Sequence, residues 1–314
     1  MNSEVKTLEE LLETAVTPGE RGVDPNRVRR AIITGGSTGL GRYIAIALAK
    51  DNCDVAITYA HNRDDAELTA KAVESFGRRC VIEQLDLEQP QTAEPAIDKM
   101  VEALGGLDIF VSNAGTMVMQ KMPSIDLEHL EKLFRINTFG AVLGCQHAFR
   151  HMLNLFDAED SGPLEQVKDK VAQFTKQHIA KPRETPGRII LITSTHEHVA
   201  SPVDSVYTMS KHALGGFIKT AAFDCKGLNI TVNGIRPGEI ATPINNMHPE
   251  DATDTKRTTL PAERAGHPME IAEAVRFLAD DASSFITGVS YDVGGGIAIG
   301  QPMALDAYRQ AVKS

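Results

Sequence analysis

The sequence predicts an α/β fold, a single doubly wound domain in which a seven-stranded parallel sheet carries helices on both faces. Two observations predict it. Short apolar runs alternate with helical segments from residue 29 onward in the 314-residue chain, which is the pattern of repeated strand–helix–strand units. These runs are also apolar along their whole length, as expected of parallel strands that are buried on both faces.

The expected strands follow one another in order, and each ends in polar or Gly-rich residues. They cover residues 31–33, 55–59, 80–82, 107–111, 188–192, 230–235 and 289–293. Helices are expected between them, for example at residues 43–49 and 65–76. Right-handed crossovers bring the carboxyl ends of all strands to one edge of the sheet, where such folds bind their ligands.

Two segments fall outside this alternation. Residues 1–28 form an N-terminal arm in which Leu8, Leu11 and Leu12 have helical spacing after a capping-box pattern, so we expect a short amphipathic helix there. The arm is either a solvated tail or a segment that docks on a neighbouring subunit. Residues 156–187 are too long for a simple connection and contain an inserted amphipathic helix, which packs on its own domain, contacts another subunit or covers the substrate. Residues 29–314 form the domain itself.

Composition disfavours several classes of protein. The chain has 32 Lys and Arg against 42 Asp and Glu, a formal charge of −10, so no nucleic-acid partner is expected, because like charges repel. No apolar run reaches the roughly 18 residues that span a bilayer, and the acidic N-terminus lacks the features of a secretory signal. The four cysteines are far apart in sequence and predict neither a disulfide framework nor a metal site. We expect a cytoplasmic protein with a small-molecule substrate and no membrane partner.

A glycine-rich turn follows the first strand and opens the first helix. Its sequence is Thr34-Gly35-Gly36-Ser37-Thr38-Gly39-Leu40-Gly41. Glycines permit a tight turn and a close approach of the backbone to a diphosphate, which free N–H groups and the helix dipole then stabilise. A nucleotide-hydrolysing loop would need Lys and Ser or Thr directly after the last glycine, and this chain has Arg42-Tyr43 there. The turn therefore predicts a Rossmann-type dinucleotide site.

Tyr207 and Lys211 are four residues apart, so they face the same way if the segment is helical. A phenol with a pKa of about 10 is a poor base at neutral pH, but a neighbouring ammonium stabilises the phenolate. Tyr207 could then exchange a proton with an alcohol or a carbonyl oxygen. Ser194 follows the strand at 188–192 and could hold the developing alkoxide, and Asn137 could hold a water molecule beside Lys211. Each feature alone is common on helices and turns, but their order along one sheet edge favours catalysis.

These motifs together resemble those of the short-chain dehydrogenases/reductases. The resemblance extends from residue 30 to residue 296 and departs from the family pattern at Ser112, usually Asn, at the arm and at the insertion. It implies an NAD(P)-dependent oxidoreductase that forms a homotetramer. The matching residues are Thr34-Gly35-x-x-x-Gly39-x-Gly41, Asp86-Leu87, Asn113-Ala114-Gly115, Asn137, Ser194, Tyr207-x-x-x-Lys211 and Pro237-Gly238 with Thr242.

The resemblance also implies a role for each residue. Tyr207 is then the general acid/base, and Ser194 stabilises the substrate oxygen. Lys211 binds the ribose and activates Tyr207, while Asn137 supports the proton relay. The remaining matches contact the cofactor, from the diphosphate through the adenine to the nicotinamide end: Gly35, Ser37, Thr38, Gly39, Leu40, Gly41, Asp86, Leu87, Asn113, Ala114, Gly115, Pro237, Gly238, Ile240 and Thr242.

The end of the second strand predicts a preference for NADP(H), with NAD(H) possible. Members of the family that prefer NAD usually carry an Asp here, which binds the ribose 2′-hydroxyl, whereas this chain has Tyr59. His61, Arg63 and the hydroxyl groups of Ser37 and Thr38 could bind a 2′-phosphate. Arg63 could equally be a solvated loop charge.

The substrate is the least constrained part of the prediction. Several stretches, such as Ser194-Thr195-His196-Glu197 and Ala241-Thr242-Pro243-Ile244-Asn245, look similar to bacterial glucose 1-dehydrogenases. We therefore expect a sugar or polyol first, bound by His196 and Asn245 under a mobile lid at 244–262. Met117 lies in an apolar stretch that suits a hydrophobic ligand instead, so a 3-oxoacyl or other hydrophobic ketone is the alternative. A dinucleotide sensor without catalysis is the alternative of another class.

Overall fold

Seven parallel strands form one sheet in the order β3-β2-β1-β4-β5-β6-β7. The computed structural model describes residues 26–153, 185–200, 205–254, 256–258 and 260–299. The order runs outward from β1 in one direction and from β4 in the other, which is the arrangement of a doubly wound fold. The predicted fold class is confirmed. The strands are β1 Arg29–Ile33, β2 Cys53–Tyr59, β3 Cys80–Gln84, β4 Ile109–Ser112, β5 Gly187–Ile192, β6 Ile230–Pro237 and β7 Ser290–Val293.

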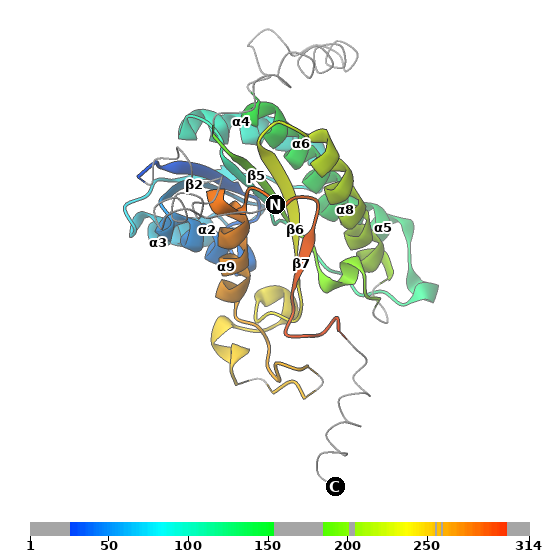
Figure 1. The fold of residues 1–314 in the computed structure, drawn as a ribbon. Coiled ribbons are helices and arrows are strands. Elements are labelled where there is room, and N and C mark those ends of the chain that lie inside the picture. Colours follow the sequence, from blue (N-terminus) through cyan, green and yellow to red (C-terminus); the bar gives the residue numbers. More distant parts are fainter. Residues whose placement is uncertain (1–25, 154–184, 201–204, 255, 259, 300–314) are drawn as a thin grey trace, which may run out of the picture.

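Helices cover both faces of this sheet (Figure 1). The elements α2, α3 and α9 pack on one face, and α4, α6 and α8 on the other. The longer helices are α2 Gly39–Lys50, α3 Arg63–Glu74, α4 Ala93–Leu104, α5 Leu127–Phe134, the π-helical segment η3 Arg135–Phe139, α6 Gly140–Met152, α8 Ser205–Asp224 and α9 Pro268–Ala279. Short 3₁₀ turns are η1 Pro90–Thr92, η2 Met122–Ser124, η4 Thr195–Glu197, η5 Pro243–Asn245, η6 Pro249–Ala252 and η7 Asp281–Ser283.

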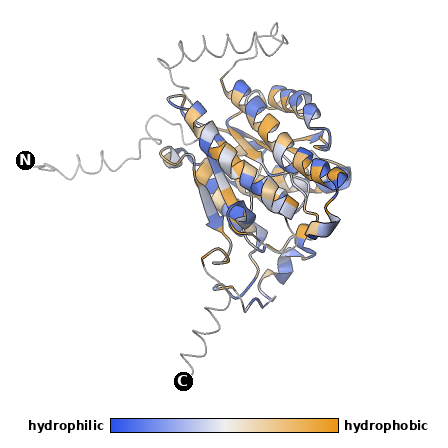
Figure 2. Cartoon of the chain, turned by 90° about the vertical axis from the view of Figure 1, so that its right-hand side faces the viewer, coloured by the Kyte–Doolittle hydropathy of each residue, from blue (hydrophilic) through white to orange (hydrophobic). Residues whose placement is uncertain are grey.

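The core consists of two apolar layers, one on each side of the sheet. Along β1, Ala31 and Ile33 belong to the layer under α2 and α9, while Ile32 belongs to the layer under α4, α6 and α8. This alternation follows from the two-residue period of a strand. The covering helices carry both apolar and polar residues (Figure 2), as helices with one buried and one solvated face do.

The sequence-based boundaries differ from the observed ones mainly at element ends. β1 begins at Arg29, two residues earlier than expected, because its backbone already pairs with β2 at Arg29 and Arg30, whose guanidinium groups are held by the Ala279 carbonyl and by Asp108. The expected arm helix and the inserted helix lie outside the described residues. Within the described part of the chain, no helix combines the length and apolar character needed to cross a bilayer.

Candidate active site

A cavity of about 690 Å³ opens at the carboxyl ends of the strands. In Figure 1, the segment that follows β6 continues from this edge of the sheet. Most of the predicted site residues line the cavity. Those that do not are Gly41, Tyr59, Arg63 and Asn137. Those that do are Gly35, Ser37, Thr38, Gly39, Leu40, His61, Asp86, Leu87, Asn113, Ala114, Gly115, Met117, Ser194, His196, Tyr207, Lys211, Pro237, Gly238, Ile240, Thr242 and Asn245.

The glycine turn is held in place by its neighbours on two other strands. The Gly35 N–H donates to Thr58 Oγ1 at 2.9 Å. The Asn113 side chain donates to the carbonyl oxygens of Thr34 and Gly35 at 2.9 and 3.1 Å. In return, Thr34 Oγ1 accepts the backbone N–H groups of Asn113 and Ala114. Sequence reasoning missed the roles of Thr34 and Thr58, since a threonine in or beside a strand carries no signal of its own.

Two positions of the turn require glycine for different reasons. Gly39 has φ +51°, a left-handed conformation that side chains disfavour. A Cβ on Gly41 would lie 2.1 Å from the Gly35 carbonyl oxygen, so the turn packs directly against the first turn of α2. Thr38, the residue before that helix, makes no side-chain capping bond. The N–H groups at the start of α2 are thus available to a diphosphate, and the chain fits a bound dinucleotide here.

Ser194, His196 and Tyr207 lie together on one wall of the cavity. Ser194 Oγ accepts the His196 backbone N–H at 3.1 Å and lies 3.2 Å from His196 Nδ1. The His196 ring packs edge-on against the Tyr207 ring, with centroids 5.5 Å apart. His196 therefore contacts both groups that are predicted to handle the substrate oxygen.

Lys211 is one helical turn after Tyr207 on α8 and is almost fully buried, with 5% of its surface exposed. Its Nζ lies 5.6 Å from the centre of the Tyr207 ring and donates to the Ile192 carbonyl at 3.3 Å. Burial lowers the pKa of Lys211 from 10.5 to about 8, and the negative charge of Glu197 offsets part of this effect. An ammonium in this position stabilises a neighbouring phenolate.

Glu197 is a residue of the site that sequence reasoning gave no role. It is buried at the end of η4, accepts a 2.6 Å hydrogen bond from Thr193 Oγ1 and lies 3.6 Å from the Arg236 guanidinium. A Cβ on Gly215 of α8 would lie 2.6 Å from Glu197 Cγ. Gly215 was the sequence signal for this contact, because glycine is unfavourable inside a helix and here makes room for the Glu197 carboxylate.

Asn137 holds the loop after β4 rather than facing the cavity. Its Oδ1 accepts the Thr116 N–H at 2.8 Å, and its Nδ2 donates to the Thr116 carbonyl at 2.9 Å and to Ser210 Oγ at 3.3 Å. It lies in the π-helical segment η3, and such bulges often occur at functional sites. Whether it also holds a water molecule beside Lys211 stays a prediction.

The residues predicted to select the cofactor separate into two groups. Ala60 and His61 line the cavity. The Tyr59 side chain belongs to the core layer on the side of α2, α3 and α9, with 7% of its surface exposed, and it hydrogen-bonds the Arg63 side chain. Arg63 opens α3 and pairs with Glu67 at 3.0 Å, one turn away on the same exposed face. These placements favour His61 over Arg63 as a 2′-phosphate contact.

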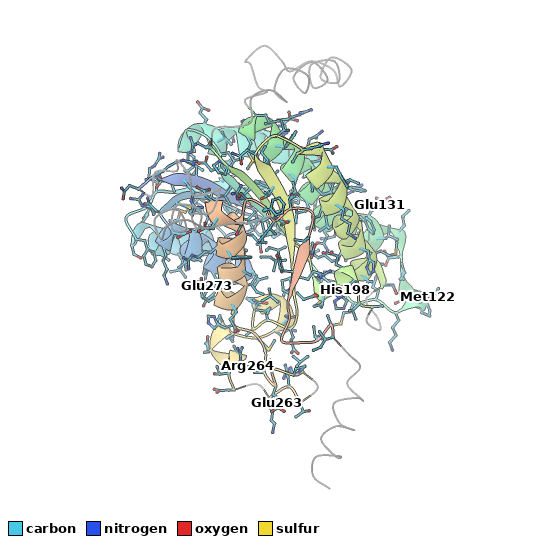
Figure 3. All side chains as sticks on the ribbon, in the orientation of Figure 1. Met122, Glu131, His198, Glu263, Arg264 and Glu273 are labelled. Carbon is cyan, nitrogen blue, oxygen red and sulfur yellow. The ribbon has the colours of Figure 1, made fainter. Side chains whose placement is uncertain are left out.

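The substrate end of the cavity is largely apolar, with Met117, Met119 and Ile244 in its wall. The loop that carries these methionines continues to Met122, which projects into solvent and is 83% exposed (Figure 3). Asn245, predicted to bind substrate, uses its side-chain N–H to hold the Ile240 carbonyl at 2.8 Å. This hydrogen bond of Asn245 thus shapes the loop after β6.

A parallel sheet of this order, with a glycine turn for a diphosphate and a Tyr–Lys pair at the same edge, defines a dinucleotide-dependent oxidoreductase. The family model described as short chain dehydrogenase matches residues 29–163, and the model described as enoyl-(acyl carrier protein) reductase matches residues 170–298. The chain belongs to the short-chain dehydrogenase family and acts on CH–OH groups. The family implies an NAD(P) cofactor and a small-molecule substrate.

Three relatives illustrate the range of similarity. The uncharacterized oxidoreductase YohF of Escherichia coli K12 is 35% identical over 274 residues, 87% of this chain and 96% of that protein. The crystal structure of acetoin dehydrogenase YohF from Salmonella typhimurium has a TM-score of 0.74 and 35% identity, and the match covers 88% of this chain and 98% of that one. Glucose 1-dehydrogenase 2 of Bacillus subtilis is 27% identical, with 86% and 95% covered. The expected likeness to glucose 1-dehydrogenases therefore exists but is weaker than the likeness to the YohF proteins.

Proposed function

We propose that this protein interconverts a secondary alcohol and a ketone, with NADP(H) as the preferred cofactor and Tyr207 as the general acid/base. The observation that carries the proposal is the meeting of Ser194, Tyr207 and Lys211 beside the glycine turn in one cavity. The nicotinamide, when bound, supplies or accepts the hydride. The residues of the chain manage the oxygen and its proton.

Each of the three residues has a distinct task in this proposal. Ser194 Oγ donates a hydrogen bond to the substrate oxygen, which is strongest when negative charge develops on it. The Tyr207 hydroxyl gives its proton to that oxygen during reduction and takes it back during oxidation. The buried Lys211 ammonium stabilises the phenolate that Tyr207 becomes. Asn137 acts one step away, by fixing the Thr116 backbone next to the cavity.

The preference for NADP(H) rests on the end of β2. Tyr59, Ala60 and His61 provide no carboxylate that would repel a 2′-phosphate or bind a 2′-hydroxyl. His61 and Ser37 both line this end of the cavity. NAD(H) is the second candidate.

For the substrate, we favour a small hydroxyketone or vicinal diol. Methionine and isoleucine side chains in the wall suit a compact, partly apolar molecule, while His196 beside Ser194 offers one polar group to a neighbouring oxygen. The Salmonella relative carries the name acetoin dehydrogenase. A sugar or polyol is the second candidate, supported by the more distant glucose 1-dehydrogenase. The same apolar wall would admit a 3-oxoacyl chain.

The experiment compares Tyr207→Phe with the unchanged chain in both reaction directions, following the absorbance of the reduced nicotinamide. We expect kcat to fall by about 10²–10⁴-fold, the range for a lost general acid/base, while cofactor binding persists. Tyr291→Phe is the matched control, because Tyr291 lies on β7, is 41% exposed and does not line the cavity. Near-normal turnover in Tyr207→Phe would refute the catalytic role.

A substrate panel separates the remaining candidates. It contains acyclic hydroxyketones and diols, sugars and polyols, and 3-oxoacyl thioesters, each tested with both cofactors. We expect the highest kcat/KM for an acyclic hydroxyketone with NADPH. Cofactor binding without turnover of any compound would favour the sensor instead.

We also propose that the protein is a homotetramer, as the family resemblance implies; its cytoplasmic location stays a prediction. Phe139, Leu143 and Met209, on η3, α6 and α8, are large apolar side chains that are 38–51% exposed in the single chain. Subunit contacts would bury such groups. Light scattering after size exclusion should give four times the chain mass of 34.0 kDa.

A further inference from the structure

Two pairs of potential metal ligands face each other across the contact between α4 and α6. Glu94 and Asp98 are one turn apart on α4, and His147 and His151 are one turn apart on α6. Residues four apart on a helix lie on the same face. Both helices cover the same side of the sheet (Figure 1), and the apolar side chains beneath these pairs belong to one core layer.

Three of the side chains converge at their ligating atoms, and Glu94 approaches one of them. His147 Nε2 lies 3.2 Å from Glu94 Oε1 and 3.5 Å from Asp98 Oδ1. His151 Nε2 lies 2.6 Å from the same Asp98 Oδ1. Ligand atoms of Asp98, His147 and His151 are all within 4.8 Å of one another. The two imidazole rings pack edge to face, inclined at 74°, with centroids 5.9 Å apart.

The two separations from His147 Nε2 are close to those between neighbouring ligands of a tetrahedral metal site. Zinc binds histidine nitrogen and carboxylate oxygen at about 2.0–2.2 Å, which puts neighbouring ligand atoms roughly 3.3 Å apart. The two distances from His147 Nε2 already lie near that value. The close contact between His151 and Asp98 needs to lengthen by roughly 0.7 Å to reach the same geometry, which a small rotation of the exposed carboxylate supplies.

Burial divides the cluster into a fixed part and an adjustable part. His147 and His151 are 3% and 15% exposed, whereas Glu94 and Asp98 are 58% and 47% exposed. The imidazoles are therefore positioned by packing between the helices, while the carboxylates form an open mouth through which an ion can enter. A purely solvated ion pair would not bury two imidazoles side by side.

The cluster is separate from the active site. None of its four residues lines the cavity at the strand ends. His147 is ten residues after Asn137 along η3 and α6, which corresponds to roughly 15 Å at 1.5 Å per residue. An ion bound there would not touch the substrate oxygen, and its direct effect would be to join α4 to α6.

We propose that Asp98, His147 and His151, with Glu94 as fourth ligand, bind one divalent transition-metal ion, for which Zn²⁺ is the best match. Two imidazoles and two carboxylates are ligands that zinc accepts in tetrahedral sites. The bound ion ties two helices that are connected in sequence only through β4 and α5. It stabilises the folded chain in proportion to its affinity.

The test is calorimetric titration of the full chain, treated with chelator and dialysed, with Zn²⁺. We expect one ion per chain in the unchanged protein. Asp98→Asn and His151→Gln, both at partly exposed positions that tolerate the change, should weaken binding at least tenfold. Glu102→Gln, an exposed carboxylate on α4, and His212→Gln, an exposed imidazole on α8, are the matched controls and should bind as the unchanged chain does.

Two further readouts check the same site. Zn²⁺ should raise the melting temperature of the unchanged chain and of Glu102→Gln but not of Asp98→Asn. Co²⁺ should give the visible absorption of a tetrahedral complex with the unchanged chain, and His151→Gln should abolish it. The proposal is overturned by the absence of binding, by binding that survives in Asp98→Asn and His151→Gln, or by equal loss in Glu102→Gln.

Discussion

At the scale of single residues, Lys211 keeps a positive charge where water has little access. Desolvation by burial lowers its pKa to about 8 from 10.5, which corresponds to roughly 3 kcal/mol of free energy against holding the charge. This value already includes the favourable charge of Glu197, and Nζ also donates a hydrogen bond to the Ile192 carbonyl. The charge that we propose stabilises the Tyr207 phenolate therefore reduces the stability of the fold.

We predict that Lys211→Met abolishes most activity and makes the fold more stable near pH 7. In the unfolded chain Lys211 has its ordinary pKa of 10.5, and in the folded chain about 8. The cost is therefore fully present below pH 8 and disappears as the pH rises from 8 to 10.5. The gain near neutrality should be about 2 kcal/mol, after allowing about 1 kcal/mol for the lost hydrogen bond.

Urea unfolding of both chains at pH 7 and at pH 10 measures this difference. The advantage of Lys211→Met should shrink at the higher pH. A variant that is less stable than the unchanged chain at pH 7 would contradict the argument, since it would mean that the buried ammonium stabilises the fold.

Cofactor choice is a second property set by single side chains. We predict that Ala60→Asp lowers kcat/KM for NADP(H) relative to NAD(H) at least tenfold, because a carboxylate at the end of β2 repels the 2′-phosphate and can bind a 2′-hydroxyl. Arg63→Ala should change this ratio little, since Arg63 pairs with Glu67 away from the cavity. Steady-state rates with both cofactors provide the ratio. An unchanged ratio in Ala60→Asp would show that this position does not determine the choice between NADP(H) and NAD(H).

At the scale of elements, the turn between β1 and α2 packs closely against the start of α2 at Gly41. We predict that Gly41→Ala weakens cofactor binding at least tenfold, because its Cβ would meet the Gly35 carbonyl oxygen at 2.1 Å and displace the turn. Gly216→Ala is the matched control: a Cβ there meets nothing within 4 Å, and alanine in a helix is favoured by about 1 kcal/mol over glycine. Fluorescence titration with NADPH and thermal unfolding should separate the two effects.

The elements themselves could be predicted from sequence, whereas some side-chain directions could not. The strands carry continuous apolar runs with clear ends, so their existence and their order along the chain could be predicted. A strand buried on both faces has no polar–apolar alternation, however, and so gave no warning that Tyr59 points into the core. The π-helical turn at Asn137 depends on contacts with Thr116 and Ser210 that are 21 and 73 residues away, which no local pattern encodes.

The residues of the candidate site could be proposed from sequence where a local pattern identifies them. The prediction missed residues whose contacts are distant in sequence. The glycine turn and the Tyr207–Lys211 pair are specific sequence signals, because the proposed chemistry requires these residue types at this spacing. Glu197 was missed because its contacts include Arg236 on β6 and Gly215 on α8 as well as Thr193 after β5. The cluster on α4 and α6 was missed because two ordinary helix faces form it only once they pack.

At the scale of the whole molecule, the two edges of the sheet have different tasks. The carboxyl edge holds the cavity, while the amino edge holds buried charges. Asp108, 1% exposed, accepts hydrogen bonds from the Arg30 backbone N–H at 3.0 Å and from its guanidinium at 2.8 and 3.1 Å, and it also pairs with Arg27. The ion pairs of Asp108 therefore lie at the opposite edge of the sheet from the candidate active site.

We predict that Asp108→Asn lowers the free energy of unfolding by about 3 kcal/mol, since removing one partner of a buried ion pair typically costs 3–5 kcal/mol and the arginines here are partly exposed. The KM for the cofactor should stay unchanged. Chemical denaturation measures the first and steady-state kinetics the second. Asp224→Asn, an exposed carboxylate at the end of α8, should alter neither, and an equal loss in both variants would remove the special role of Asp108.

The hydrogen bond that Thr58 accepts from Gly35 and the one that Asn113 donates to Thr34 fix the glycine turn in the protein chain alone. A receptor that is preorganised in this way gives up little conformational entropy on association. The phosphate-bearing half of a dinucleotide should consequently recognise the apoprotein without help from the nicotinamide half. Discrimination between the two nicotinamide dinucleotides then depends on the rim of the cleft, where we expect His61 to contact the extra phosphoryl group.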